Sequence, residues 1–234
     1  MPAPAPSIHT FEFGDVRLVA DQLGEPVFLL LHAGGERRKV WQPIAERLWQ
    51  SGYGSLAVDQ RGHGESGGTR GDGVARFAAD AAEIIAGQST PIIVVGASLG
   101  GFCGLLAATE PAARRNMRGL VLVDVIPDPD PDRVRAYLRT TTPPLDQSPL
   151  VDDILGQSEK LREASAGIDF PVLLVVAGEG SITDSDIKRL SEAVSELKVV
   201  RIEHASHLVA RDKPYELAEV LLSFAKELPR LGAE

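Results

Sequence analysis

The sequence has few of the features that define several classes of protein. Cys103 is its only cysteine, so no intrachain disulfide can form and a cysteine-rich metal cluster is excluded. Its 24 lysines and arginines are outnumbered by 33 aspartates and glutamates, which gives a formal net charge of -9. Because phosphate binding depends on clustered cations, this balance argues against nucleic acid as a partner.

Long apolar runs are missing as well. No stretch approaches the roughly 18 consecutive apolar residues that suggest a membrane-spanning helix. The opening segment, MPAPAPSIHTFEF, has neither the charged n-region nor the apolar h-region of a secretory signal. We therefore expect no membrane span and a cytoplasmic location.

The 234 residues, 44% of them hydrophobic, are enough for one domain with a large core. A strand or hairpin is expected over 10–20. Six short apolar runs have the length and composition of buried parallel strands: 27–32, 54–59, 91–97, 119–124, 171–177 and 197–203. Segments with helical spacing lie between them: 41–49, 74–85, 102–109, 186–194 and 215–228. This alternation predicts a single α/β domain over 1–234, with a mostly parallel central sheet flanked by helices.

One segment, 127–168, interrupts the alternation. It opens with PDPDPD, and its helix-like patches are confined to 133–138 and 151–161. A connection of this length is unusual for a plain loop inside a compact domain. We interpret it as a small cap, or lid, inserted over the carboxyl edge of the sheet.

The strongest chemical motif is Gly96-Ala97-Ser98-Leu99-Gly100, which matches G-x-S-x-G. It follows a predicted strand and precedes a predicted helix, the setting of a nucleophile elbow. Small neighbours are needed because the serine occupies a strained backbone. The following helix points its amides at the reacting oxygen. Ser98 is therefore the candidate nucleophile.

With this motif, LLLHAGG, DQRGHGES and SHLVARDKPYELAEVLLSF make nearly the whole chain resemble the α/β-hydrolase family. The likeness is to its serine esterase and lipase branch. It implies hydrolysis of a small-molecule ester or related acyl bond, with neither metal nor organic cofactor. A serine nucleophile disfavours epoxide hydrolase and haloalkane dehalogenase chemistry.

A serine hydroxyl needs a base within hydrogen-bond reach. His9, His32 and His63 are interpreted as loop or turn organisers. His204 and His207 both follow the last predicted strand, as the chain order nucleophile, acid, histidine requires. The family's pattern favours His207 as the base.

The acid departs from the family's usual pattern. The family most often has an aspartate in the turn after the strand at 171–177, but that turn reads Gly178-Glu179-Gly180-Ser181. Some branches take the acid from the end of the preceding core strand, and Asp124 stands there. Sites in open α/β folds gather at that edge of the sheet. Asp124 is preferred, with Asp184 second and Glu179 third.

An oxyanion hole needs two backbone N–H donors. Leu99, directly after the nucleophile, is expected to give one, and Gly34 the other, with Gly35 as the alternative. Two further functions stay open. One is perhydrolysis or C–C bond hydrolysis at the same site. The other is ligand binding without catalysis, which stays open because residue 181, where the family usually has its acid, is a serine.

Overall fold

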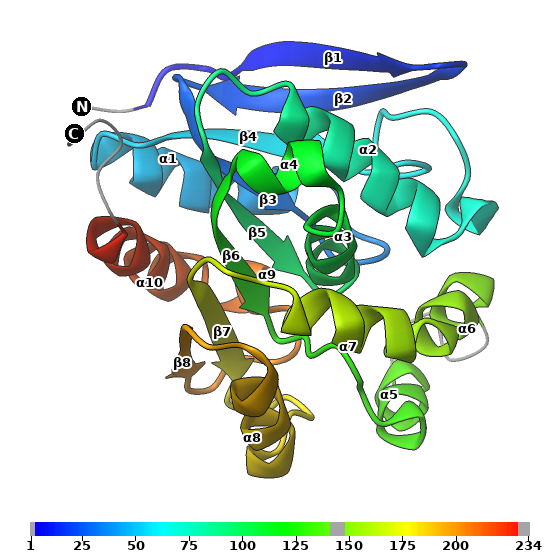
Figure 1. Cartoon of the computed structure of the whole chain (residues 1–234). Helices are drawn as coiled ribbons and strands as arrows, with labels where there is room; N and C mark the ends of the chain where they lie inside the picture. Colours follow the sequence, from blue (N-terminus) through cyan, green and yellow to red (C-terminus); the bar gives the residue numbers. More distant parts are fainter. Residues whose placement is uncertain (1–2, 141–147, 229–234) are drawn as a thin grey trace.

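The computed structural model describes residues 3–140 and 148–228, so 141–147 of the expected cap lie outside the described part. Eight strands form one sheet in the order β1-β2-β4-β3-β5-β6-β7-β8 (Figure 1). Their bounds are β1 (Ser7–Phe13), β2 (Val16–Leu23), β3 (Pro26–Leu31), β4 (Gly54–Asp59), β5 (Ile92–Ala97), β6 (Met117–Val123), β7 (Val172–Ala177) and β8 (Leu197–Ile202). The α/β class and the mostly parallel sheet are therefore as predicted.

The directions of the strands indicate the edge of the sheet at which a ligand would bind. The N-terminal hairpin β1–β2 is antiparallel and joins β4 antiparallel, whereas all five remaining neighbouring pairs are parallel. The chain leaves β3 for β4 on one side and later returns to add β5 on the other. Ligands of open α/β sheets bind at such a reversal, outside the carboxyl ends of the strands. The loops after β3 and β5 meet at that point.

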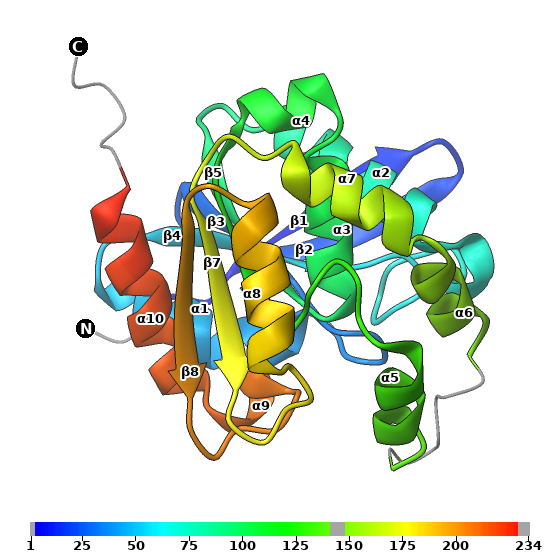
Figure 2. The ribbon, with the colours of Figure 1, turned by 60° about the horizontal axis from the view of Figure 1, so that its bottom comes forward.

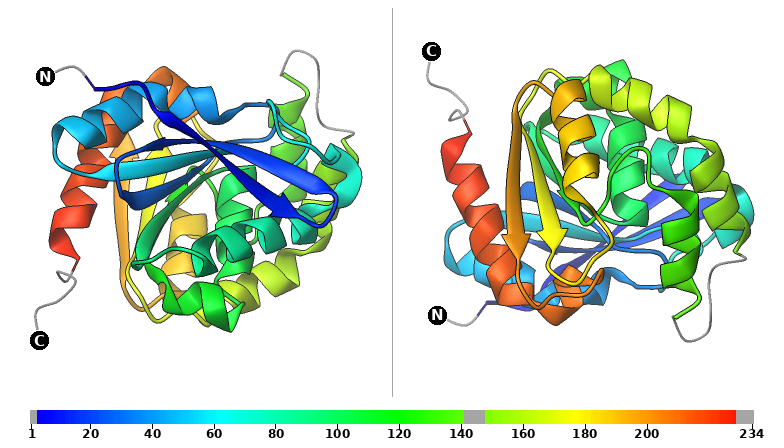
Figure 3. Two further views of the ribbon diagram at one scale, coloured as in Figure 1. Left: turned by 90° about the horizontal axis from the view of Figure 1, so that it is seen from above. Right: turned by 90° about the horizontal axis from the view of Figure 1, so that it is seen from below.

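Side-chain alternation along the strands builds two cores. In β3, Leu29 and Leu31 face one side of the sheet, and Phe28 and Leu30 face the other, all four fully buried. The first face is covered by α2 (Val74–Ala86), α3 (Leu99–Ala107), α4 (Pro111–Arg115), α7 (Ser158–Ala166) and α8 (Asp184–Ala193). The second is covered by the 3-10 helix η1 (Arg38–Trp41), α1 (Gln42–Gln50), α9 (Val209–Asp212) and α10 (Pro214–Glu227) (Figures 2 and 3).

The helix expected over 41–49 is present as α1, with Trp41 in the preceding η1, and the ring of Trp49 lies against Gly24 and is 37% exposed. Two other local features differ from the expectations. The helix α4 was not predicted, since its five residues are too few to show a helical period. The continuous patch at 151–161 is interrupted at Gln157, which separates α6 (Pro149–Gly156) from α7.

The connection between β6 and β7 contains two kinds of helix (Figure 2). Leu161 of α7 is fully buried, and α7 packs against α3 as part of the layer on that face. By contrast, α5 (Pro131–Leu138) has no buried residue.

The short 3-10 helix η2 (Arg70–Asp72) precedes α2. No helix in the described ranges has the length and apolar character to cross a membrane.

Candidate active site

Ser98 stands at a strained turn between β5 and α3. Its φ of 47° and ψ of -111° lie in a region that side-chain-bearing residues rarely adopt. A Cβ atom at Gly96 would overlap the backbone of Gly100, and one at Gly100 would overlap the carbonyl of Leu31. Both glycines of the motif are therefore required by close backbone approach. The strand–turn–helix setting expected from the sequence is present.

Asp124 follows the end of β6, the strand beside β5. Ala97 pairs with Val123 in the parallel register, and the amide of Ser98 donates to the carbonyl of Val123 at 3.3 Å. Ser98 and Asp124 are thus the first residues beyond two paired strand ends. Asp124 also has a positive φ, 50°, and is only 3% exposed.

The Asp124 carboxylate has two partners. Its Oδ1 accepts the amide of Ala177 at 2.9 Å, and its Oδ2 lies 2.8 Å from Nδ1 of His207. With the carboxylate as acceptor, Nδ1 carries the proton and donates, which leaves Nε2 of the neutral ring free to accept one. The two residues are 83 positions apart in the chain.

The other acid candidates lie elsewhere. The side chain of Asp184 is 99% exposed at the start of α8, 3.7 Å from Arg201. Glu179 is exposed in the turn after β7. In that turn, a Cβ at Gly180 would come within 2.7 Å of the Asp124 carboxylate, so glycine leaves room for it.

Of the two candidate bases, only His207 has this partner. His204 is exposed and has a positive φ of 55°. The loop that carries His207 is held by Asp212, whose carboxylate accepts the amide of Ser206 at 3.1 Å and also its hydroxyl. The Ser206 hydroxyl in turn accepts the amide of Leu208 at 3.3 Å. These bonds on both sides restrict the position of the imidazole.

The loop after β3 is positioned by two buried histidines. His32 donates from Nδ1 to the carbonyl of Ala33 at 2.8 Å, and its Nε2 accepts the amide of Gln60 at 3.0 Å. Burial is the main cause that lowers the pKa of His32 to about 4. Burial also lowers the pKa of His63. Both rings therefore stay neutral near pH 7, and the expectation that they organise turns fits these contacts.

His63 also bears on the two glycines proposed for the oxyanion hole. Its Nε2 accepts the amide of Gly35 at 3.1 Å, so that N–H is already used inside the protein. Gly34 is exposed, and a Cβ on it would lie 4.0 Å from the Cβ of Leu99. Gly34 thus lies beside the residue expected to give the other donor.

The sequence did not single out two residues near this site. The ring of Tyr137, on α5, meets the ring of His207 edge-on, with centroids 5.1 Å apart. No motif marks Tyr137. Glu36 is half-buried, and burial raises the pKa of its carboxyl. It follows the His32–Gly35 loop directly, so its position in the chain could have identified it as a residue near the active site.

Comparison with known proteins agrees with the fold. Residues 25–144, about half of the chain, match the family model described as serine aminopeptidase, S33. The chain belongs to this family, and its fold is that of the α/β-hydrolases. A relative from Variovorax paradoxus (strain S110), provisionally named carbamate hydrolase RutD, is 35% identical over 117 residues. The match covers 49% of this chain and 43% of that relative's length.

Solved structures extend the likeness to nearly the whole chain. The Mycobacterium tuberculosis esterase Rv0045c superposes with a TM-score of 0.72 at 20% identity, over 95% of this chain and 93% of that one. A thioesterase domain from the curacin biosynthetic pathway gives 0.75 at 18%, over 94% and 100%. The N-acyl homoserine lactonase AidH gives 0.71 at 20%, over 98% and 99%. At these identities the likeness establishes the shared fold.

Proposed function

We propose that the protein is a serine hydrolase that cleaves a carboxylic ester, or a related lactone or thioester, through an acyl-enzyme. Ser98 is the nucleophile, His207 the general base and Asp124 the residue that orients it. The observation that carries the proposal is the Asp124–His207 hydrogen bond, formed beside the strained turn of Ser98. That pairing gives the imidazole the tautomer that a serine nucleophile requires.

The reaction follows from these atoms. Nε2 of His207 takes the proton of the Ser98 hydroxyl as its oxygen attacks the substrate carbonyl. The amides of Leu99 and Gly34 donate to the oxyanion that forms, and Asp124 stabilises the imidazolium. His207 then protonates the leaving group. Water, activated by the same imidazole, attacks the acyl-enzyme and releases the acid together with free Ser98. Neither a metal nor an organic cofactor takes part.

The bond class is supported by what the similar proteins have in common. The esterase, the thioesterase and the lactonase each act, by name, on an acyl bond to oxygen or sulfur. The ligand-binding alternative rested on the missing acid at Ser181. That reason no longer supports the alternative, because the carboxylate of Asp124 lies at Nδ1 of His207. Carboxylesterase action is therefore the function we infer.

Two further features belong to the proposal. The segment 127–168 is a small cap within the single domain, with α5 as the part that reaches His207 through Tyr137. Within that segment α7 belongs by its packing to the layer that covers the sheet.

We also propose that the enzyme works in the cytoplasm on a small-molecule substrate. Its one cysteine, Cys103, is a buried free thiol.

The test is hydrolysis of p-nitrophenyl acetate, butyrate and octanoate, beside an aryl thioester, a lactone and an aryl carbamate. We expect turnover of at least one ester at about 1 s⁻¹ or faster, the lower end of ordinary enzyme rates. Where deacylation is slower than acylation, p-nitrophenol appears in a burst equal to the enzyme concentration. Release no faster than with heat-unfolded protein, for every substrate, would contradict the proposal.

A further inference from the structure

The helix that touches His207, α5, has no side chain in the hydrophobic core. None of the eight residues of α5 is buried. Its N-terminus is capped by Asp130, which accepts the amide of Arg133 at 2.9 Å, and Pro131 occupies the first turn. Val134, Tyr137 and Leu138 are only half-buried, so α5 gains less from the hydrophobic effect than a core helix does. Its polar contacts therefore contribute to its position.

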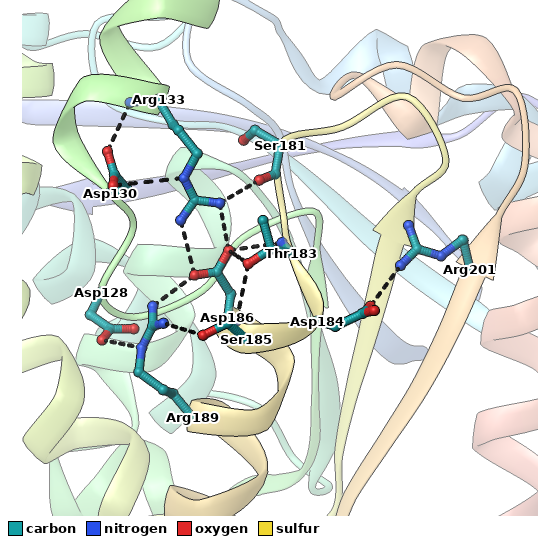
Figure 4. Close-up of polar contacts among 10 residues, drawn as sticks. All are labelled: Asp128, Asp130, Arg133, Ser181, Thr183, Asp184, Ser185, Asp186, Arg189 and Arg201. Atoms are coloured by element: carbon teal, nitrogen blue, oxygen red, sulfur yellow. Dashed lines mark hydrogen bonds and ion pairs between the residues drawn. The ribbon is translucent and has the colours of Figure 1, made fainter.

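Arg135 pairs with the exposed Asp152 of α6, a surface pair that contributes little. Arg133 instead reaches a buried carboxylate, Asp186 of α8 (Figure 4). Its side chain is 1% exposed and accepts Arg133 from α5 in a two-pronged pair, at 2.7 and 3.0 Å. Arg189 donates to the same carboxylate at 2.7 Å and to Asp128 at 3.0 Å. The amide and hydroxyl of Thr183 each donate to it at 2.8 Å. Planar, bidentate pairs of this kind fix orientation as well as distance.

The pair is ionised at neutral pH. Burial alone would raise the pKa of Asp186, but hydrogen bonds from two arginines and Thr183 outweigh it and hold the pKa well below its usual range. Arg133 also donates to the carbonyl of Ser181 at 2.7 Å, in the turn between β7 and α8. The beginning of α5 is thus fastened to the α8 end of the fold. We name the Arg133–Asp186 pair the α5 latch.

Tyr137 lies four residues after Arg133, so the two side chains leave α5 on the same face, one turn apart. The Tyr137 ring meets the His207 imidazole at an interplanar angle of 65°. Burial raises the pKa of the Tyr137 hydroxyl, so the phenol is neutral at pH 7. An edge-on aromatic contact of this kind restricts the neighbouring ring.

We propose that Tyr137 is a positioning residue for His207 and that the α5 latch holds it there. The proposal rests on the function proposed above. Asp124 restrains the imidazole by a hydrogen bond at Nδ1, and Tyr137 restrains it by the edge-on contact between the two rings. Loss of either Tyr137 or the latch leaves the base in place but less well oriented. The transition state should suffer more than substrate binding, so kcat should fall while KM changes little.

The test compares four variants with wild type in ester hydrolysis: Tyr137→Phe, Tyr137→Ala, Arg133→Gln and the double variant Arg133→Gln/Tyr137→Ala. We expect Tyr137→Ala to lower kcat about 3- to 10-fold, from the usual strength of an aromatic pair. Tyr137→Phe should stay within about twofold because the ring contact remains. Arg133→Gln should lower kcat by a similar factor, and the double variant should be no worse than Tyr137→Ala alone.

Arg135→Gln is the matched control. It removes another arginine of α5, paired with Asp152 of α6 at 2.7 Å and not with Asp186, and should leave kcat within about twofold. Three kinetic results would overturn the proposal: an unchanged kcat in Tyr137→Ala, an equal loss in Tyr137→Phe, or fully multiplicative losses in the double variant. Far-UV circular dichroism checks that each variant is folded.

A readout independent of turnover separates this proposal from the proposed function. The NMR chemical shifts of the His207 ring protons depend on the ring current of Tyr137. They should move in Tyr137→Ala, move in the same direction in Arg133→Gln, and stay in place in Arg135→Gln. If wild type hydrolyses no ester, the serine hydrolase proposal fails and these shifts still decide whether the latch positions Tyr137. If the shifts are absent, the latch proposal fails even in an active enzyme.

Discussion

Ser98→Ala should lower kcat for ester hydrolysis by about 10⁴-fold or more, the loss that removal of a serine nucleophile produces elsewhere. The reason is specific to the reaction: without the hydroxyl no acyl-enzyme forms, while the oxyanion donors and the base remain. The variant should fold normally, because alanine removes one half-buried oxygen and adds no atom that could clash. Initial rates with p-nitrophenyl butyrate, beside urea unfolding of both proteins, measure both expectations.

The matched control is Ser181→Ala. Ser181 has an exposed side chain at the position where the family usually has its acid, and only its carbonyl is used, by Arg133. This variant should keep activity within about twofold. A Ser98→Ala protein that retained a tenth of wild-type activity would rule out Ser98 as the nucleophile.

Asp124→Asn should lower kcat by about 10³- to 10⁴-fold, as the same change does in another serine hydrolase triad. An asparagine can keep the bond from the Ala177 amide through its carbonyl oxygen. Its NH₂ group then faces Nδ1 of His207, which must act as an acceptor. The ring proton moves to Nε2, and that atom can no longer take the proton of Ser98. The defect is a wrong tautomer and not a lost fold.

Asp184→Asn tests the competing assignment in the same assay. Its carboxylate is exposed and 3.7 Å from Arg201, so its removal should change kcat by less than about twofold. Similar losses in both variants, or a larger loss in Asp184→Asn, would mean that Asp124 is not the acid. Because the two changes are chemically identical, the comparison depends on position alone.

Much of the fold could be predicted from single-sequence patterns. The apolar runs that became β3 to β8 are buried strands of a kind that periodicity detects, and glycine-rich motifs located the turn of Ser98. Short or interrupted helices were missed or joined, as at α4 and Gln157, because a few residues carry no measurable helical period.

The site was harder to predict because its contacts are distant in sequence. Asp124 could be proposed from its place at a strand end, but the bond to His207 joins residues 83 apart. That the amide of Gly35 is already used could not be predicted, because its acceptor, His63, is 28 residues away. The contact of Tyr137 with His207 and the pair of Arg133 with the buried Asp186 join α5 to elements distant in the sequence. No local pattern encodes these contacts.

The most direct test of the account is covalent labelling with a fluorophosphonate, in which the activated serine oxygen forms a bond to phosphorus and fluoride leaves. Peptide mass spectrometry should find one adduct per chain, on Ser98. The labelling rate should fall by about 10³-fold or more in His207→Ala, because the base is lost, and stay near wild type in His204→Ala. An adduct on a different serine, or a rate that is the same in His207→Ala as in wild type, would contradict the proposed site.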